Sequence, residues 1–422
     1  MNPLLVAEQV GTPCYVYDLG TITDAHADLT KSLPHPSTLY YSLKANPHPR
    51  IVAALAELGC HAEISSKGEI DSAVEAGVPG EHMLLTGPGK AEETIDYALG
   101  HGIRHFSVDS PVDLDRVGER AFSYGVEVEC LLRVNADSAM TGGSGLTMTG
   151  TASQFGADAA WILEEPQRFK AHGIATVTGL HLYMGSNLLD EDTLVSQFGI
   201  AIDLVVRLSE QLEHLREVDL GGGFGAPYAK TGSRPQFPNL AARVEEMLDD
   251  RLKGWRTGEP RISFESGRYL VAESGVLVCE VLDAKRSKDE LFVVLDTGVN
   301  HLGGMSGLRR IPRSGPSVIP ASGIPHEPED AVQTSVVGPL CTPLDTLGHD
   351  MAMPPMATGD LVTVPNVGAY GLTASLLAFL GHRAPMEVVT RGNEVLVVSQ
   401  LQVKRSDLDP DRFFDPLSTQ GV

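Results

Sequence analysis

The chain has 422 residues, with 32 Lys and Arg against 55 Asp and Glu, which gives a formal net charge of −23. This length exceeds what one small core needs and suits a large barrel followed by a second domain. So acidic a chain is a poor partner for nucleic acid or an anionic membrane surface, and we interpret its charge as a source of solubility.

The cysteine content and the N-terminus indicate a cytoplasmic setting. Five cysteines, at positions 14, 60, 130, 279 and 341, are odd in number and include no Cys-x-x-Cys pair, so neither a disulfide framework nor a metal site is indicated. The N-terminal stretch MNPLLVAEQVGTPCYVYD lacks the basic start and long apolar core of a signal peptide. No apolar run approaches the ~20 residues of a membrane span.

Short β-branched runs alternate with amphipathic stretches from about residue 38 to residue 266. The predicted strands are TLYYSLKA, CHAEIS, HMLLT, RHFSVD, VECLLRVN, TVTGLHLYMG, REVDLGG and RISFES. This alternation predicts βα units and a parallel sheet, and eight units in about 250 residues match a (β/α)8 barrel. An open doubly wound sheet is the alternative, but it normally carries a Gly-rich phosphate loop after its first strand, and this chain has none there.

After residue 270 the predicted strands have little helix between them, which is typical of an all-β domain of sandwich or barrel type. The N-terminal stretch CYVYDLG can join that sheet. We predict a barrel domain over 25–270 and a β domain formed by 1–24 and 271–422. Two long loops, 138–154 and 313–330, are either lids or interface arms, or simple disordered insertions.

Polar residues follow the predicted barrel strands, where this fold places its chemistry. In chain order they are Lys44, Glu63, Asp109, Arg133, Asn135, His181, Tyr183, Gly221 to Gly223, Glu265 and Arg268. Each has an ordinary explanation alone, since a lysine at a strand end is usually a surface residue and a glycine triplet is usually a turn. Their order along the βα pattern is what indicates a site.

These side chains suit an aldehyde cofactor that carries a phosphate. We expect Lys44 to have a pKa lowered by a hydrophobic wall and to form a Schiff base. The GGGFG turn at 221–225 exposes backbone N–H groups that can bind a phosphate, and Arg268 can add a bidentate contact. Glu265 can keep a pyridine nitrogen protonated, which makes the ring an electron sink. Pyridoxal phosphate meets all four demands, although Glu265 and Arg268 can also be a structural ion pair.

Seven motifs give the chain a resemblance to a known family. They are TPCYVYD (12–18), YYSLKAN (40–46), EISSKGEI (63–70), GGGFGAPY (221–228), ESGR (265–268), GPLCTPLD (338–345) and VGAYG (367–371). In this order they resemble the type III, alanine-racemase-fold pyridoxal-phosphate decarboxylases, which include the diaminopimelate, ornithine and arginine decarboxylases. The resemblance covers nearly the whole chain and implies a barrel plus a β domain.

The resemblance also implies roles for the matching residues. Lys44 corresponds to the lysine that binds the coenzyme covalently, Glu265 faces the pyridine nitrogen, and Glu63 lies near the cofactor. The implied phosphate ligands are Ser186, Gly222, Gly223, Arg268 and Tyr370. Cys341 corresponds to a cysteine that enters the partner subunit's site and handles the proton after carbon dioxide leaves, so a homodimer with shared active sites is implied. A buried hydrophobic role is the ordinary alternative for Cys341.

The chain departs from the family pattern at two positions. Tyr183 stands in GLHLYMGS where many members have a histidine stacked on the ring, and we expect it to keep the stacking role while His181 is a core residue. Thr342 follows the cysteine where decarboxylases of basic amino acids have an acidic residue, so a substrate with a distal ammonium is disfavoured. We predict that Thr342, Asp345 and Arg309 face the substrate, although Arg309 can also be a solvated surface charge.

These departures favour a natural-product branch of the family. That branch includes the enzyme of butirosin biosynthesis that decarboxylates glutamate held on an acyl carrier protein, and decarboxylases of carboxylate siderophore assembly. A substrate acylated at its far end needs no acidic residue after the cysteine. Three alternatives stay open: diaminopimelate decarboxylase of lysine synthesis, a racemase with Tyr370 as its second base, and a cofactor-free regulatory relative.

Overall fold

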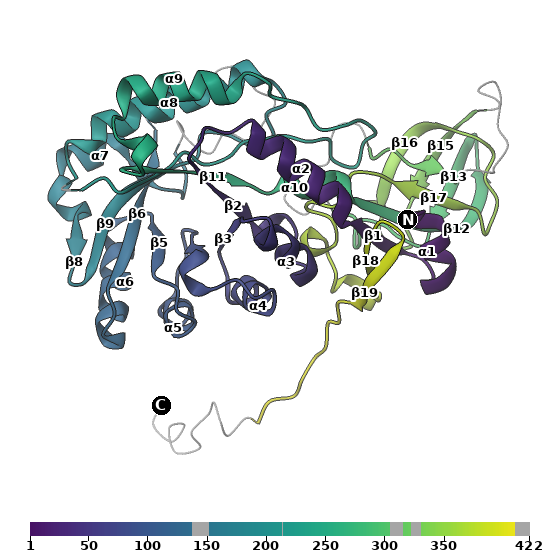
Figure 1. Cartoon of the computed structure of the whole chain (residues 1–422). Helices are drawn as coiled ribbons and strands as arrows, with labels where there is room; N and C mark the ends of the chain where they lie inside the picture. Colours follow the sequence, from purple (N-terminus) through teal and green to yellow (C-terminus); the bar gives the residue numbers. More distant parts are fainter. Residues whose placement is uncertain (137–151, 213, 304–314, 322–330, 410–422) are drawn as a thin grey trace.

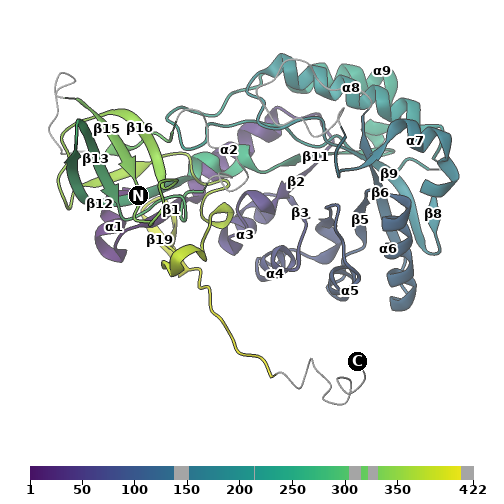
Figure 2. The same cartoon turned by 180° about the vertical axis from the view of Figure 1, so that it is seen from behind.

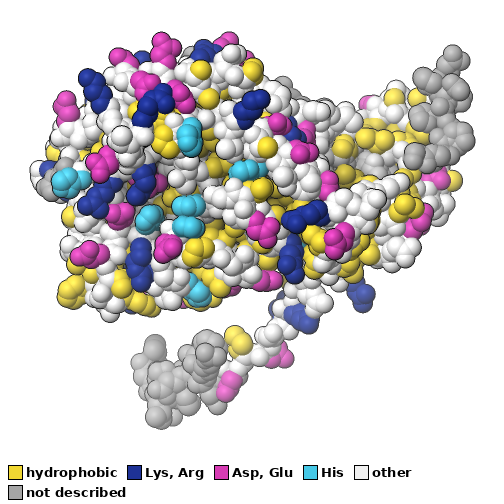
Figure 3. Space-filling model, in the orientation of Figure 1, with side chains coloured by type: hydrophobic (Ala, Val, Ile, Leu, Met, Phe, Trp, Pro, Cys, Tyr) yellow, Lys and Arg dark blue, Asp and Glu magenta, His cyan; other side chains and the backbone are white. Residues whose placement is uncertain are grey.

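The computed structural model describes residues 1–136, 152–212, 214–303, 315–321 and 331–409. Figure 1 shows two parts, a barrel of strands surrounded by helices and a separate sheet domain beside it. The reverse view in Figure 2 shows the same division. On the face seen in Figure 3, acidic and basic side chains are interspersed over the barrel, so the excess negative charge does not form a continuous acidic patch there.

Eight parallel strands form a closed barrel. They are β2 (Thr38–Ser42), β3 (His61–Ile64), β4 (Met83–Leu85), β5 (His105–Val108), β6 (Val128–Asn135), β9 (Ala175–Leu182), β10 (Glu217–Asp219) and β11 (Arg261–Ser266). Each strand pairs in parallel with its neighbours, β11 pairs with β2, and the β6–β9 pairing completes the ring. The predicted barrel is therefore confirmed, and the alternative of an open sheet is excluded. Two short strands pair beside the barrel strands: β7 (Ala157–Asp158) pairs with β6, and β8 (Ala171–His172) pairs with β9.

Helices cover the outside of the barrel (Figure 1). They are α2 (Leu19–Lys31), α3 (Pro49–Glu57), α4 (Lys67–Glu75), α5 (Glu92–Gly100), α6 (Pro111–Tyr124), α7 (Ala159–Glu164), α8 (Glu191–Ser209), α9 (Leu240–Arg251) and α10 (Arg268–Val271). Helix α6 shows how the sequence sets the ends. Ser110 caps its start, Pro111 occupies the first turn, and Gly125 ends it with a φ of 66° that suits glycine. Its inward face buries Leu114, Val117 and Ala121.

The second domain is a mixed sheet preceded by α1 (Pro3–Val10). Its strands are β1 (Cys14–Asp18), β12 (Gly275–Ser287), β13 (Glu290–Leu295), β14 (Ile319–Pro320), β15 (Val332–Val337), β16 (Thr346–Met353), β17 (Leu361–Val364), β18 (Met386–Arg391) and β19 (Glu394–Gln400). Strand β1 pairs antiparallel with β12 and parallel with β18, so the N-terminal strand joins this sheet as predicted.

The link between the two domains is helix α2. It spans Leu19–Lys31, so the predicted division after residue 24 falls inside a continuous helix. Because a helix is a poor place for a domain boundary, we propose that the barrel domain runs from α2 through α10 and that the β domain resumes with β12.

Three further features concern loops and termini. The predicted loops at 138–154 and 313–330 lie largely outside the described residues, and the second contains the short strand β14. After β19 the chain runs away from both domains (Figures 1 and 2). None of the described helices has the length and apolar character required to cross a bilayer.

Candidate active site

One pocket at the carboxyl ends of the barrel strands gathers most of the predicted site residues. Of the predicted residues, it is lined by Lys44, Tyr183, Ser186, Gly222, Gly223, Glu265, Arg268 and Tyr370. Seven of these come from the barrel and its loops, while Tyr370 comes from the β domain. The site therefore forms where the two domains meet.

Lys44 follows β2 in a short 3-10 turn, and its side chain is 46% exposed. Its amine lies 3.3 Å from Glu63 Oε2, and Thr86 donates a 2.7 Å hydrogen bond to Glu63 Oε1. Strand register explains the contact, because Ser42 at the end of β2 pairs with Glu63 in β3. Glu63 was predicted to lie near the cofactor, and the structure places it directly beside Lys44.

The expectation that Lys44 has a lowered pKa is wrong for this structure. Burial acts to lower its pKa, but the carboxylates of Glu63 and Glu265 act in the opposite direction, and the net result is a raised pKa. Burial raises the pKa of Glu63, yet Lys44 and the hydroxyls of Ser42 and Thr86 bring it down to about 2. The two groups therefore form an ion pair. The surroundings of the Lys44 amine, expected from the sequence to be hydrophobic, include carboxylates.

Glu265 lies on β11 and is buried. Its Oε1 has no hydrogen-bond partner among the described residues and lies 3.3 Å from His181 Nε2. Burial, followed by the charges of Glu63 and Asp219, raises the pKa of Glu265 well above its ordinary value. Glu265 therefore lines the pocket while one of its oxygens faces His181.

The glycine turn after β10 packs too closely for side chains. A Cβ on Gly222 would lie 2.3 Å from the Glu265 carbonyl oxygen, and one on Gly225 would lie 2.6 Å from that of Leu188. Gly223 has a φ of 112°, in the region that favours glycine. The turn therefore presents bare backbone to the pocket, as the motif predicted.

Arg268 lies on the opposite side of this turn, at the start of α10. Its guanidinium has no hydrogen bond or ion pair with any described residue, and the guanidinium carbon lies 4.7 Å from the Tyr370 ring centroid. Tyr228 donates a 3.1 Å hydrogen bond to the Tyr370 carbonyl. The guanidinium thus stays available to an anion that enters the pocket.

Tyr183 carries the first departure from the family pattern. Its ring centroid lies 5.9 Å from the Lys44 amine and 6.0 Å from the Arg133 guanidinium carbon. An aromatic face is therefore present beside the lysine. His181, expected to be a core residue, is indeed buried. Its Nε2 lies 3.3 Å from Oε1 of Glu265, which lines the pocket.

Several pocket residues were not predicted. They are Ser42, Asn187, Phe224, Ser266 and Gly267. Each lies within two residues of a predicted one, so proximity to the motifs was the available signal. Arg133 was noted as a strand-end residue without a role, and it is buried with its guanidinium carbon 4.8 Å from the Phe155 ring centroid.

The loop that carries Cys341 is exposed and supplies no residue to the pocket of its own chain. Asp345 does not face a substrate in this structure. It is buried, and its two carboxylate oxygens accept hydrogen bonds of 2.8 Å from the backbone N–H groups of Val299 and Leu340. Its role here is to fix the loop that contains Cys341 and Thr342. Arg309 lies outside the described residues.

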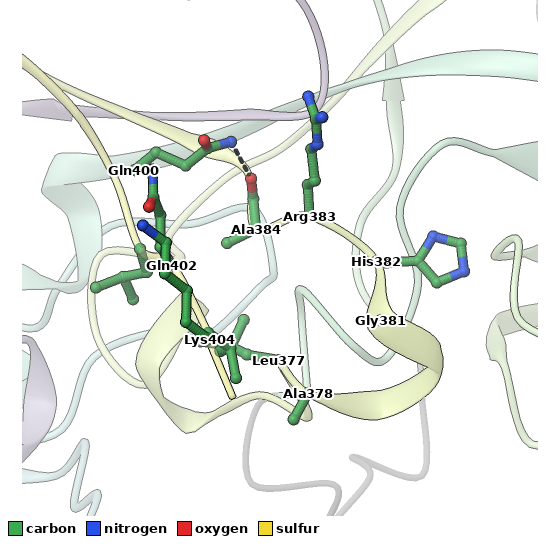
Figure 4. A pocket seen from close by; sticks show the side chains of 11 residues that line it. Leu377, Ala378, Gly381, His382, Arg383, Ala384, Gln400, Gln402 and Lys404 are labelled. Carbon is green, nitrogen blue, oxygen red and sulfur yellow. Dashed lines mark hydrogen bonds between the residues drawn. The ribbon is translucent and has the colours of Figure 1, made fainter. Parts of the chain in front are cut away.

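A second hollow lies between residues 377–384 and the chain at the end of β19, residues 400–404 (Figure 4). Cationic side chains on it come from Arg383 and Lys404, His382 lines it too, and Gln400 donates a 2.7 Å hydrogen bond to the Ala384 carbonyl. None of the predicted site residues lines it. The barrel-mouth pocket is therefore the better candidate for the active site.

The pocket residues fit pyridoxal phosphate. An amine open to the pocket can hold an aldehyde, and a buried carboxyl in the pocket wall can face a ring nitrogen. Bare glycine backbone and a free guanidinium are the donors that a phosphate needs. An aromatic ring beside the amine completes the set.

Comparisons with known proteins agree with this chemistry. Residues 19–272 match the family model described as pyridoxal-dependent decarboxylase, pyridoxal binding domain. The chain is 31% identical to the L-glutamyl-[BtrI acyl-carrier protein] decarboxylase of Niallia circulans, over 95% of this chain and 96% of that protein. It is 29% identical to the diaminopimelate decarboxylase of Zymomonas mobilis, over 94% and 92%.

Two further comparisons concern another substrate and a solved fold. The 2-[(L-alanin-3-ylcarbamoyl)methyl]-2-hydroxybutanedioate decarboxylase of Staphylococcus aureus is 28% identical over 88% of this chain and 92% of that protein. The structure of diaminopimelate decarboxylase from Helicobacter pylori in complex with L-lysine superposes with a TM-score of 0.79, at 26% identity, over 93% and 95%. The chain therefore belongs to the pyridoxal-dependent decarboxylases and is an enzyme that uses pyridoxal phosphate to decarboxylate an amino-acid substrate.

Proposed function

We propose that this decarboxylase acts on an amino acid whose far end is acylated, either on an acyl carrier protein or as an amide in a siderophore-type precursor. The observation that carries the proposal is Thr342. It follows Cys341 directly, it is neutral, and its hydroxyl accepts a 3.3 Å hydrogen bond from the Leu344 N–H. A neutral hydroxyl engaged with its own loop cannot neutralise a distal ammonium, whereas an acylated end needs no such partner.

Two relatives support this substrate class by the names they carry. One acts on glutamate borne by an acyl carrier protein, and the other acts on a compound whose alanine part is joined through a carbamoyl group. Both names describe an amino acid joined to a further group, a carrier protein in one and a unit linked through a carbamoyl group in the other. A biosynthetic role in secondary metabolism follows for the present chain as part of the proposal.

Pocket residues on both domains would hold the coenzyme. We assign Lys44 to the covalent bond, Glu265 to the pyridine nitrogen and Tyr183 to the ring face. The phosphate would be bound by Ser186, Gly222, Gly223, Arg268 and Tyr370. When bound, pyridoxal phosphate supplies an electron sink for the electrons released as the carboxylate leaves.

The protein's own groups would orient the substrate and manage protons. Glu63 stabilises the protonated form of Lys44, so it holds a proton at the amine whenever the amine is free. Glu265 lines the pocket that the substrate would enter, while Glu63 lies beside the Lys44 amine without lining the pocket. The proton that replaces the carboxylate would come from Cys341.

We propose that Cys341 reaches the pocket of a second subunit. It is exposed on its own chain and does not line the pocket there, while Leu344 beside it is 77% exposed. A large apolar side chain so exposed next to a reactive thiol suits an interface between subunits. A homodimer with shared sites would place Cys341 and Thr342 opposite Lys44 of the partner.

The alternative function is diaminopimelate decarboxylase, which a relative and a superposed structure of that name favour. The purified enzyme should be supplied with diaminopimelate, ornithine, free glutamate, a side-chain amide of diaminopropionate and glutamyl carrier protein, and the products should be read by mass. We expect an acylated or carrier-bound substrate to exceed diaminopimelate at least about tenfold in kcat/KM. Diaminopimelate as the best substrate would contradict the proposal.

A substitution at Thr342 provides a matched test. Thr342→Asp should raise turnover of ornithine relative to wild type, because it restores a carboxylate that can pair with a distal ammonium. Thr342→Ser keeps the hydroxyl and should retain the wild-type preference. If both variants show the same preference, Thr342 does not determine the substrate class.

A further inference from the structure

Three buried polar side chains lie side by side at the barrel wall next to the pocket. They are His181 on β9, Asp219 at the end of β10 and Glu265 on β11. One polar atom from each lies within 4.8 Å of the other two. Strand order explains the cluster, because β10 pairs with both neighbours and Asp219 stands opposite His181 in the register.

The outer contacts of this trio are well defined. Ser107 Oγ lies 2.7 Å from His181 Nδ1, and Asp219 Oδ1 accepts a 2.8 Å hydrogen bond from the Gly221 N–H of the glycine turn. The inner atoms are different. His181 Nε2, Asp219 Oδ2 and Glu265 Oε1 have no hydrogen-bond partner among the described residues.

Two carboxyl groups buried beside an imidazole would repel each other if both were ionised, so the group as a whole keeps a proton. Burial raises the pKa of Asp219 to about 8, and it raises that of Glu265 well above its ordinary value. Burial, followed by the charge of Arg133, lowers the pKa of His181. The charged groups that act on the trio from other elements are Lys44, Glu63, Lys90 and Arg133, and Glu217 acts from β10 itself. The carboxyl pair therefore retains a proton that neither group would hold in water.

We propose that His181 and Asp219 are positioning residues that hold a shared proton against the buried oxygen of Glu265, and so set the charge that Glu265 presents to the coenzyme ring. The 3.3 Å separation between His181 Nε2 and Glu265 Oε1 allows a hydrogen bond once a proton lies between them. This inference rests on the coenzyme of the family and on the assignment of Glu265, and not on the identity of the substrate.

A metal ion is the competing occupant of the same three atoms. A structural metal usually takes four ligands, and the described residues offer three. Metal analysis of the purified protein separates the two ideas. The proposal expects no stoichiometric metal, and a bound metal that disappears in Asp219→Asn would overturn it.

The cofactor-free protein provides the first test. The folded state keeps the proton of Asp219 up to about pH 8, while the unfolded chain loses it near pH 4, so stability falls as pH rises between these values. Asp219→Asn preserves an oxygen for the Gly221 N–H and removes the titration. We expect urea unfolding from pH 5 to 9 to show a slope smaller by about one proton in this variant. An unchanged slope would overturn the shared proton.

The holoenzyme provides the second test, through coenzyme affinity and the pH titration of its visible absorbance. His181→Asn keeps an amide near Nδ1 for Ser107 but removes Nε2, whereas His181→Gln places an amide nitrogen near Nε2. His181→Asn and Asp219→Asn should weaken coenzyme binding about ten- to hundredfold and shift the absorbance titration by about one pH unit. His181→Gln should restore most of the coenzyme affinity and most of the wild-type absorbance titration.

Glu387→Gln is the matched control, since Glu387 is a buried carboxyl of the β domain that also has a raised pKa. It should change the pH dependence of stability but leave the absorbance titration and coenzyme affinity unchanged. If His181→Asn and Asp219→Asn behave like this control in the holoenzyme, the trio is a structural part of the barrel wall and the proposal fails. That outcome would leave the proposed substrate class unaffected.

Discussion

The backbone N–H of Tyr370 donates a 2.7 Å hydrogen bond to the carbonyl oxygen of Ala45, the residue that follows Lys44. The Asn46 side chain donates a second bond, 2.9 Å long, to the Gly368 carbonyl. A loop of the β domain is thereby fixed to the end of barrel strand β2. Tyr370 has a φ of 53°, which a bulky residue adopts only when surrounding contacts hold it there.

Asn46→Ala tests this connection. The substitution removes the bond to Gly368 and leaves a buried carbonyl without its partner, which should cost about 1–3 kcal/mol in the free energy of unfolding. Coenzyme affinity should also fall, because the Tyr370 loop loses an anchor. Urea unfolding and coenzyme titration measure the two effects. Asn239→Ala, which removes an exposed bond to Glu191, is the control and should change neither appreciably.

Glu63→Gln tests the electrostatic control of Lys44. Glu63 is the strongest influence that raises the pKa of Lys44, and an amine attacks an aldehyde only when neutral. Each unit by which the pKa falls gives about ten times more neutral amine at fixed pH. The cofactor-free variant should therefore capture pyridoxal phosphate roughly tenfold faster at neutral pH, as followed by absorbance.

Thr86→Val is the control for this experiment, because it removes a hydrogen bond to Glu63 but leaves the carboxylate charge in place. We expect its capture rate to stay close to that of wild type. Capture by Glu63→Gln at the wild-type rate would show that Glu63 does not set the charge of Lys44.

The barrel was predictable because each of its strands is a short β-branched run bounded by amphipathic stretches. The motif residues were predictable because they follow those strands. The trio of His181, Asp219 and Glu265 was not, since its members come into contact only through the pairing of β9, β10 and β11. The raised pKa of Lys44 was also missed, because it depends on Glu63 from the adjacent strand.

The contacts of Asp345 within its own chain were not predictable for a related reason. Its place in the motif GPLCTPLD indicated a substrate contact, but it is used to hold the loop through the backbone of Val299 and Leu340. Val299 lies far away in the sequence, so no local pattern shows that contact. Motif position indicates that a residue is near a site without indicating which way its side chain points.

Mixed dimers test the shared active site. Lys44→Ala and Cys341→Ala homodimers should each be impaired, and a heterodimer should regain activity because one of its two sites keeps both residues. If the sites act independently, a random mixture of the two variants should show about a quarter of wild-type activity, and the purified heterodimer should show about half. Carbon dioxide release from separately tagged, co-purified subunits measures this. Absence of recovery in a verified heterodimer would contradict the proposed placement of Cys341.

Glu387 provides a prediction about pH and stability. Burial raises its pKa to about 7 in the folded protein, and the hydrogen bond from Tyr17 opposes that rise. The folded state therefore keeps a proton that the unfolded chain loses above about pH 4.5, so the protein loses stability as pH rises from there to about 7. Glu387→Gln should remove roughly 3 kcal/mol of this pH dependence, measured by urea unfolding at both ends of the window. An identical slope in the variant would show that Glu387 is already ionised.

The most direct test of the account is to locate the coenzyme on the chain. Holoenzyme is reduced with borohydride, digested and sequenced by mass spectrometry. We predict the pyridoxyl group on Lys44, whose amine is open to the pocket, and none on Lys90, which is 2% exposed and lies 2.7 Å from Asp113. A label on any other lysine, or no label on protein that binds the coenzyme, would contradict the assignment of this site.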